Sequence, residues 1–130
     1  MCIFCKIVNK EIPSSCIYED ELVMAFLDLS QVTKGHTLIV PKKHYNNFLD
    51  CDEETLAHLV KVAQNIANRL MTRLNAKGIN ILSNANEIAG QSVFHFHMHL
   101  IPRYDEFDAI SIKFNESEKQ DLNALCDLLK

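Results

Sequence analysis

The sequence predicts one domain that combines helices with a β-sheet, of the α+β or the α/β class. Short β-prone runs bounded by turn-forming residues alternate with helical segments, and residues 50–78 repeat apolar side chains at helical spacing. The chain of 130 residues has no internal repeat, low-complexity tract or interdomain linker. We therefore expect a single domain over residues 1–130, in the order helix, three strands, helix, two strands, helix. Periodicity leaves open which of these strands pair in parallel.

The first half of the chain is expected to form a short helix and three strands. The predicted elements are a helix over residues 3–8 and strands over residues 16–19, 22–28 and 37–40. Pro13 ends the leading helix, and a tight turn at Asp20 and Glu21 joins the first two strands. The third strand is apolar and follows His36, so His36 is predicted to stand at the mouth of a buried strand.

The second half is expected to contain one long helix, two strands and a terminal helix. The predicted elements are a helix from Asp50 to about Gly78, strands over residues 79–83 and 92–102, and a helix near 117–129. Asp50 with Glu53, and Ser117 with Gln120, have the spacing of a capping box at the start of a helix. The apolar residues of the last helix are expected to face the interior.

Composition limits the partners of the protein. The chain has 17 acidic and 13 basic residues, a formal net charge of −4, and no run of basic residues longer than Lys42-Lys43. This charge argues against polymeric nucleic acid and leaves a mononucleotide-sized anion as a candidate ligand. We expect no signal peptide and no membrane-spanning segment. The expected location is cytoplasmic, with the five cysteines free, metal-bound or redox-active.

Half of the six histidines lie within five residues, as His95, His97 and His99 of an otherwise apolar run. On a regular strand the three imidazoles would line one face, roughly 6.5 to 7 Å apart. Such a set could be a metal site, a nucleophile with its supports, or a chance polar cluster. The outer two rings, roughly 13 Å apart on such a strand, could not share one ion. A central neutral imidazole that attacks phosphorus, between rings that stabilise the phosphoryl oxygens, fits the pattern best.

Several runs of the sequence, in order, resemble the histidine triad (HIT) family of nucleotide-binding hydrolases and transferases. The resemblance covers about residues 2–103 and is carried by residues 3–7, 11–13, 26–28, 35–44, 90–93 and 95–101. It implies an α+β, HIT-like fold with a five-stranded antiparallel sheet, one long helix, short terminal helices and a two-fold dimer. Residues 104–130 would form a C-terminal segment, which in this family tends to shape substrate choice.

The resemblance also implies catalytic roles. His97 would attack the α-phosphorus to form a nucleotidyl-histidine, while His99 and His36 would contact the phosphate and the leaving group. Gln91 and Ser92 match positions that bind phosphate oxygens or protonate the leaving group. The predicted catalytic residues are therefore His97, His99, His36 and Ser92.

A nucleotide-binding set follows from the same resemblance. Asn84 matches a polar residue at the phosphate site, and Asp28 matches a carboxylate that accepts from ribose hydroxyls. The residues that would wall the base are Ile3, Phe4, Ile7 and Leu29. Taken alone, Asp28 could also be a turn or capping residue, and apolar residues at helical spacing could equally be core packing.

Cys2 and Cys5 form a Cys-x-x-Cys motif that has three alternative readings: a redox pair, half of a zinc site, or two packed thiols. No predicted strand precedes the motif, which argues against the redox pair. Some members of the HIT family combine such a cysteine pair with histidines that match His44 and His95. The resemblance therefore implies a closed, tetrahedral zinc site of Cys2, Cys5, His44 and His95, structural rather than catalytic.

We expect a nucleotidyl hydrolase that cleaves the α-phosphate bond of a purine nucleotide derivative. Its substrate would be a nucleoside phosphoramidate or a dinucleoside polyphosphate, its product a monophosphate such as AMP, and no organic cofactor would be needed. The alternatives are a nucleotide-binding regulatory module with incidental turnover, a nucleotidyltransferase, and a zinc-dependent interaction domain.

Overall fold

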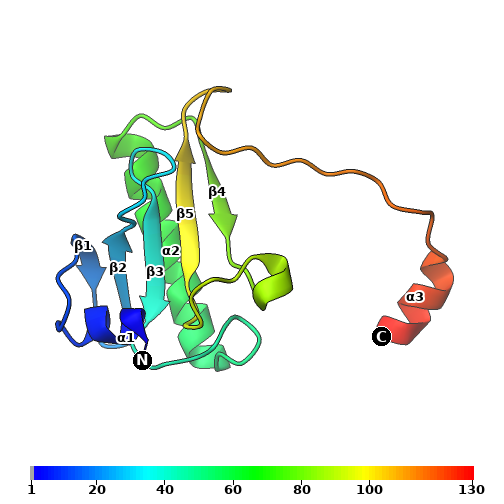
Figure 1. The fold of residues 1–130 in the computed structure, drawn as a ribbon, viewed down its shortest axis with the longest axis horizontal. Helices are drawn as coiled ribbons and strands as arrows, with labels where there is room; N and C mark the ends of the chain where they lie inside the picture. Colours follow the sequence, from blue (N-terminus) through cyan, green and yellow to red (C-terminus); the bar gives the residue numbers. More distant parts are fainter. Residues whose placement is uncertain (1) are drawn as a thin grey trace.

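The computed structural model describes residues 2–130 and contains a five-stranded sheet with the strand order β1-β2-β3-β5-β4 (Figure 1). The strands are β1 (Cys16–Glu19), β2 (Val23–Leu27), β3 (Thr37–Pro41), β4 (Gly78–Leu82) and β5 (Met98–Arg103). Every neighbouring pair is antiparallel. The α+β class is therefore confirmed, and the α/β alternative is wrong.

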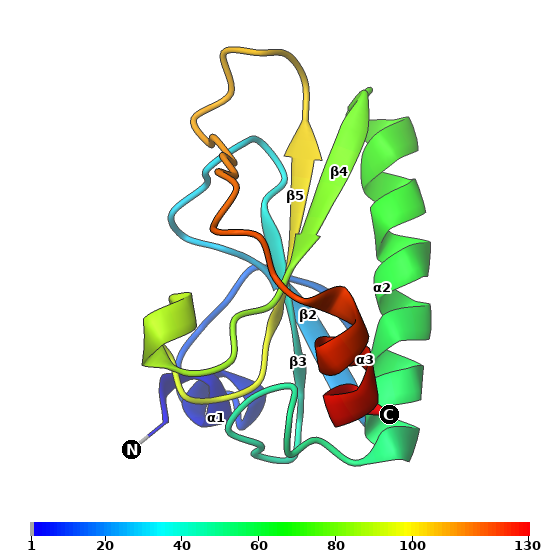
Figure 2. The same cartoon turned by 90° about the vertical axis from the view of Figure 1, so that its right-hand side faces the viewer.

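The long helix α2 (Glu53–Arg73) covers one face of the sheet (Figure 2). Its N-cap is Asp52, whose side chain accepts a hydrogen bond from the Thr55 N–H at 2.7 Å. Asp50, the predicted cap, instead accepts from backbone N–H groups of the loop before the helix. The helix also ends earlier than predicted, because the chain reverses at Asn75, which has a left-handed φ of 56°.

The alternation of side chains along the strands divides the core into two layers. The cluster beneath α2 includes Val23, Ala25, Ile39, Leu59, Ile66, Phe96 and Leu100, and the cluster on the opposite face consists of Phe4, Ile7, Met24, Phe26, Leu38 and Val40. The second cluster holds helix α1 (Ile3–Val8) against the sheet. A helix this short is unstable alone, so burial of Phe4 and Ile7, at about 1.5 to 3 kcal/mol each, decides its position.

Strand β2 is shorter than the predicted strand over residues 22–28. At its start, the Asp20 carboxylate accepts hydrogen bonds from the N–H groups of Leu22 and Val23, which closes the turn after β1. At its end, Asp28 accepts from the Ser30 N–H at 2.8 Å and begins the next turn. Asp28 therefore lies just beyond the strand, where its carboxylate can face a ligand.

The histidine strand also differs from the prediction over residues 92–102, because β5 starts only at Met98. Before it, the Phe96 N–H donates to Tyr45 O at 2.7 Å, in the loop before α2, rather than to a neighbouring strand. His95 and His97 thus lie in irregular backbone, and the expectation of three imidazoles on one regular strand is wrong. Freed from strand spacing, the three rings can point to different partners.

The loop between β4 and β5 contains the short 3₁₀ helix η1 (Glu87–Ala89), and a C-terminal arm, residues 104–130, follows β5. Helix α3 (Leu122–Leu129) near the end of the arm begins at Asp121 rather than Ser117, because the Asp121 carboxylate accepts from the Ala124 N–H. It stands well apart from the sheet (Figure 1), so the expectation that its apolar residues face the interior is wrong. None of the helices within residues 2–130 is both long and apolar enough to cross a membrane.

Candidate active site and metal site

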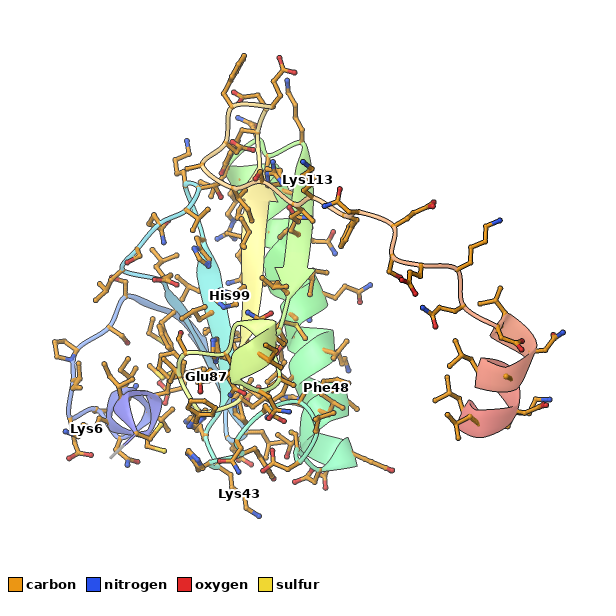
Figure 3. All side chains as sticks on the ribbon, turned by 45° about the vertical axis from the view of Figure 1, so that its right-hand side comes forward. Lys6, Lys43, Phe48, Glu87, His99 and Lys113 are labelled. Carbon is orange, nitrogen blue, oxygen red and sulfur yellow. The ribbon has the colours of Figure 1, made fainter. Side chains whose placement is uncertain are left out.

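A chain of hydrogen bonds joins the backbone to two of the histidines. The Val32 N–H donates to Nδ1 of His36 at 3.3 Å, so the proton of this neutral imidazole lies on Nε2. That Nε2 is 2.9 Å from Nδ1 of His99. His36 therefore donates to His99, which leaves His99 with its own proton on Nε2. The result is a ring on β5, in the middle of the sheet (Figure 3), whose free N–H can donate to an anion.

His97 has the opposite arrangement. Its Nδ1 is 2.8 Å from the backbone oxygen of His95 and donates to it, because a carbonyl only accepts. The second ring nitrogen, Nε2, then carries a lone pair and no proton. The ring of His97 lies edge-on to His99, with ring centroids 5.0 Å apart, and edge-on to Phe4 at the same separation. The arrangement thus places one nucleophilic nitrogen beside one N–H donor.

Burial favours the neutral form of both rings. It lowers the pKa of His97 below the usual value of 6.5. Burial, together with the neighbouring imidazoles of His97 and His36, lowers the pKa of His99 to about 4. Both imidazoles are therefore neutral near pH 7, which a nitrogen nucleophile requires.

Asp28 lies beside this relay, with Oδ2 at 3.6 Å from Nε2 of His36. The turn that follows β2 is held by Gln31, whose side-chain amide donates to the backbone oxygens of Asp28 and His36 at 2.6 and 2.7 Å. The amide oxygen of Gln31 accepts from the Gly35 N–H at 2.8 Å. Gln31 therefore fixes the acid and the histidine relative to each other.

A hollow of about 150 Å³ opens between α1 and β2, next to Asp28. Its lining includes four predicted nucleotide-binding residues, Ile3, Phe4, Ile7 and Leu29, together with Ile12, Pro13, Ser14, Ser15, Phe26, Leu27, Asp28 and Leu38. Phe4 and Ile7 are buried in the core, whereas Leu29 is 98% exposed at the mouth. Apolar walls with a carboxylate at the rim suit a flat aromatic base attached to a sugar.

The structure does not bring three predicted phosphate-site residues into contact with His97. Gln91 is buried, and all four hydrogen-bonding positions of its amide are filled: the oxygen accepts from Asn47 and Asn86, and the nitrogen donates to the backbone oxygens of Asn46 and Val93. Asn84 packs beside Gly90, whose φ is 101°. Ser92 is exposed and lines a second hollow beside Cys2 and His44. In this conformation Gln91 positions the loop rather than offering a donor to phosphate.

The four predicted zinc ligands come together at the start of α1. The ligand atoms of Cys2, Cys5, His44 and His95 all lie within 4.8 Å of one another. Nδ1 of His95 is 3.3 Å from Sγ of Cys2 and 3.4 Å from Sγ of Cys5, and Nδ1 of His44 is 3.3 Å from Sγ of Cys5. Sulfur and nitrogen ligands of a tetrahedral zinc are roughly 3.5 Å apart. The spacing and the donor set therefore fit zinc.

The surroundings of His95 also suit a metal ligand. Its Nε2 donates to the backbone oxygen of Pro41 at 2.8 Å, so Nδ1 is unprotonated and aimed at the two thiols. Asp28, His36 and His99 form a second group with ligand atoms within 4.8 Å. There, however, the two imidazole nitrogens are 2.9 Å apart, shorter than the roughly 3.3 Å expected for two ligands of one tetrahedral zinc. The second group is better described as a hydrogen-bonded relay.

Two positioning residues were not found from the sequence. Gln31 organises the turn before β3, and Ser83 donates through Oγ to the backbone oxygen of His97 at 2.7 Å. Neither belongs to a motif, because a lone Gln or Ser in a loop has no distinctive pattern. Only the folded chain brings Gln31 to His36 and Ser83 to His97.

The fold and the histidine cluster define a histidine triad protein. The family model described as "HIT domain" matches residues 9–106, and the chain belongs to the HIT family. Two solved structures are similar over nearly the whole chain. A HIT family protein from Bacillus anthracis is 45% identical with a TM-score of 0.92, and the match covers 98% of this chain and 91% of that one. A member of the HIT family from Bacillus subtilis is 42% identical with a TM-score of 0.92, covering 98% and 94%.

One curated relative has a name that describes an activity. An adenosine 5'-monophosphoramidase of Saccharomyces cerevisiae is 39% identical over 117 residues, which are 90% of this chain and 72% of the relative.

Proposed function

We propose that this chain is a nucleotidyl hydrolase that acts on the α-phosphate of an adenosine or related purine nucleotide, with Nε2 of His97 as the nucleophile. The observation that carries the proposal is the hydrogen bond from Nδ1 of His97 to the backbone oxygen of His95, which leaves Nε2 unprotonated. The N–H of His99, supplied through His36, would donate to a phosphoryl oxygen and stabilise the charge that develops there. The apolar hollow with Asp28 at its rim would hold the nucleoside.

The proposed reaction has two displacement steps. In the first, Nε2 forms a bond to the α-phosphorus while the bond from phosphorus to the leaving group breaks, and the leaving group departs with a proton. In the second, water attacks phosphorus, the nitrogen–phosphorus bond breaks, and the nucleoside monophosphate leaves with neutral His97 restored. We assign the first proton to the hydroxyl of Ser92, which is exposed and makes no hydrogen bond within residues 2–130. The proton that the attacking water loses in the second step then restores this hydroxyl.

His97→Asn tests the nucleophile. Turnover should fall by at least roughly a thousandfold, while binding of AMP remains within a few-fold of the parent protein. His58→Asn is the matched control, because His58 lies on α2, contacts Asp20 and belongs to neither site. Substantial turnover by His97→Asn would place the nucleophile elsewhere.

For the leaving group we propose an amine, so that the substrate is an adenosine phosphoramidate. The support is the similarity to the yeast adenosine 5'-monophosphoramidase. Rates on an adenosine phosphoramidate and on a diadenosine polyphosphate, measured side by side, test this choice. A higher kcat/KM on the polyphosphate would show that the leaving group is a nucleotide rather than an amine. If phosphate or a sugar phosphate captures the intermediate faster than water does, the protein is a transferase.

We also propose a structural zinc held by Cys2, Cys5, His44 and His95, which would fasten α1 to the backbone that carries His97. A closed set of four ligands supplies stability and no open coordination position for chemistry. A reducing compartment such as the cytoplasm suits thiolate ligands. Elemental analysis of protein purified without added metal should give about one zinc per chain, and Cys5→Ser should lower it. A metal-free preparation that is equally stable and equally active would refute the site.

The second candidate function is a nucleotide-binding regulatory module. Its support is that the nucleoside hollow and the proposed metal site could bind a ligand and stabilise the fold without any turnover. It predicts tight AMP binding, very slow turnover and a protein partner that is retained by His97→Asn. A two-fold dimer, proposed from the family resemblance, is compatible with either function and is tested by analytical ultracentrifugation.

A further inference from the structure

The C-terminal arm, residues 104–130, carries an exposed apolar helix. Leu122, Leu125, Cys126 and Leu129 recur at the spacing of one helix face, and Leu122 and Leu129 are 74% and 80% exposed. The side chains of α3 project into open space in Figure 3. A helix of eight residues is unstable in water by itself, so α3 needs a surface to cover this face.

The charge of the protein is concentrated in the arm. Residues 104–130 contain seven acidic and three basic side chains, a net charge of −4, which equals that of the whole chain. Residues 1–103 contain ten of each and are neutral. A surface that receives α3 should therefore combine apolar side chains with positive charge.

One hollow of the molecule has this combination. It lies between strands β1 and β2 and the C-terminal end of α2, and measures about 510 Å³. Its residues are Ile17, Leu27, Gln31, Lys34, Gly35, Arg69, Leu70, Arg73 and Leu74. No carboxylate lines it, and within residues 2–130 Lys34, Arg69 and Arg73 make no salt bridge.

The arm does not reach this hollow on its own domain. It begins beside the hollow, where Tyr104 donates to the backbone oxygen of Lys34, and Arg103 pairs with Asp108 at 2.9 Å. From there it runs away from the sheet, and α3 ends far from its starting point (Figure 1).

The similarity to solved structures extends into the arm. The two Bacillus structures match 98% of the chain at a TM-score of 0.92, a score that residues 2–110 alone could not reach, so part of residues 111–130 is superimposed as well. A conformation that is shared between related chains, and that no contact with the chain's own domain explains, points to a partner that every such chain has. That partner is another copy of the chain.

We infer that α3 of one protomer fills the hollow of Ile17, Leu27, Leu70 and Leu74 on a second copy, with Lys34, Arg69 and Arg73 of that copy facing the acidic residues of the arm. The leucine face of α3 then becomes buried, and the negative charge of the arm is balanced across the interface. This inference goes beyond the proposed catalytic function, because it gives a role in the contact between copies to residues outside the nucleotide and metal sites.

Cross-linking of the full chain tests the position of α3. Cys126 is exposed on α3, so a variant with Cys16→Ser, Cys51→Ser and Arg73→Cys presents one thiol on α3 and one at the hollow. The matched control has Lys61→Cys in place of Arg73→Cys, since Lys61 lies on the same helix beside a groove near β4. Adding Cys126→Ser to either variant gives the background from the remaining thiols.

A short bis-maleimide should join positions 126 and 73 with a yield at least fivefold higher than the yield between positions 126 and 61. Mass spectrometry of a mixture of ¹⁴N- and ¹⁵N-labelled chains should then show that the two linked peptides come from different copies. A link within one copy, a preference for position 61, or no link above background would overturn the inference. Circular dichroism identifies variants that fail to fold.

Charge reversal gives an independent test in the same cross-linking assay. Arg69→Glu should lower the yield between positions 126 and 73 several-fold, and Asp127→Lys on the partner copy should restore it. An unchanged yield in Arg69→Glu would contradict the charge complementarity, and so would a failure of Asp127→Lys to restore it.

Discussion

The lowered pKa of His99 predicts a specific acid sensitivity of the fold, and His99→Asn should reduce it. In the unfolded chain the imidazole titrates near 6.5, whereas burial and the neighbouring imidazoles lower its pKa to about 4 in the folded protein. The folded state therefore binds fewer protons than the unfolded state between these values. The corresponding stability is present above pH 6.5 and is lost as the pH falls toward 4.

The magnitude follows from the size of the shift. One pKa unit corresponds to about 1.4 kcal/mol, so the full loss would be about 3 kcal/mol below pH 4 and about 2 kcal/mol at pH 5. His99 is only partly buried, so we expect about 1 to 2 kcal/mol at pH 5. Asn keeps a polar group opposite His36 but does not titrate.

Urea unfolding of the parent protein and His99→Asn at pH 7 and pH 5 measures this effect. The free energy of unfolding of the parent should fall by about 1 to 2 kcal/mol more than that of the variant. Other titrating groups contribute to both proteins and cancel in the difference. Between pH 7 and 8 the free energies of unfolding of the two proteins should change almost in parallel, since His99 is mostly neutral in both the folded and the unfolded state. Equal losses at pH 5 would refute the assigned burial of His99.

Three further substitutions test how the sites are held. Gly35→Ala should lower the free energy of unfolding by about 1 to 3 kcal/mol in urea titrations, because Gly35 has a φ of 96° and a Cβ there would lie 2.5 Å from the Leu74 side chain. The control is Gly78→Ala, which should lower the free energy of unfolding by less than about 1 kcal/mol because a Cβ at Gly78 would have no atom within 4 Å. Ser83→Ala should lower kcat several-fold at unchanged KM and lower the free energy of unfolding by about 1 kcal/mol, since it removes the donor to the backbone oxygen of His97, the proposed nucleophile. A change in KM alone would argue against that role. Gln91→Leu should lower the free energy of unfolding by about 3 kcal/mol in thermal or urea unfolding, because the buried loop groups that bond to the Gln91 amide would lose their hydrogen-bond partner. An unchanged unfolding midpoint would exclude a positioning role for Gln91.

Local patterns predicted most elements of the fold. Apolar periodicity located α1 and α2 because each helix buries one face, and short β-prone or apolar runs located β1 and β3. The exact cap of α2 was missed, since Asp50 and Asp52 are both capping residues and only tertiary contacts choose between them. The strand predicted over residues 92–97 does not form, because the Phe96 N–H is taken by Tyr45, a residue distant in sequence.

The residue types of the candidate metal site and of the histidine relay were predicted from the sequence, whereas the distances within these groups were not. The sequence marks Cys2, Cys5, His44 and His95 by resemblance, yet it cannot state that their ligand atoms lie within 4.8 Å of one another. Gln31 and Ser83 had no signal, because a positioning residue is defined by the group it contacts.

The sequence by itself determined the identities of the chemical groups, the helix and strand periodicities and the family resemblance, because each of these is written in residue type and spacing. Tertiary structure decided the contacts of the three clustered histidines. Since β5 begins only at Met98, His95 turns toward the two thiols, His97 is fixed by a backbone carbonyl, and His99 receives its hydrogen bond from His36. Tertiary structure also decided the position of α3. The leucine pattern of this helix indicates that it needs an apolar surface, but the pattern does not identify the molecule that provides this surface.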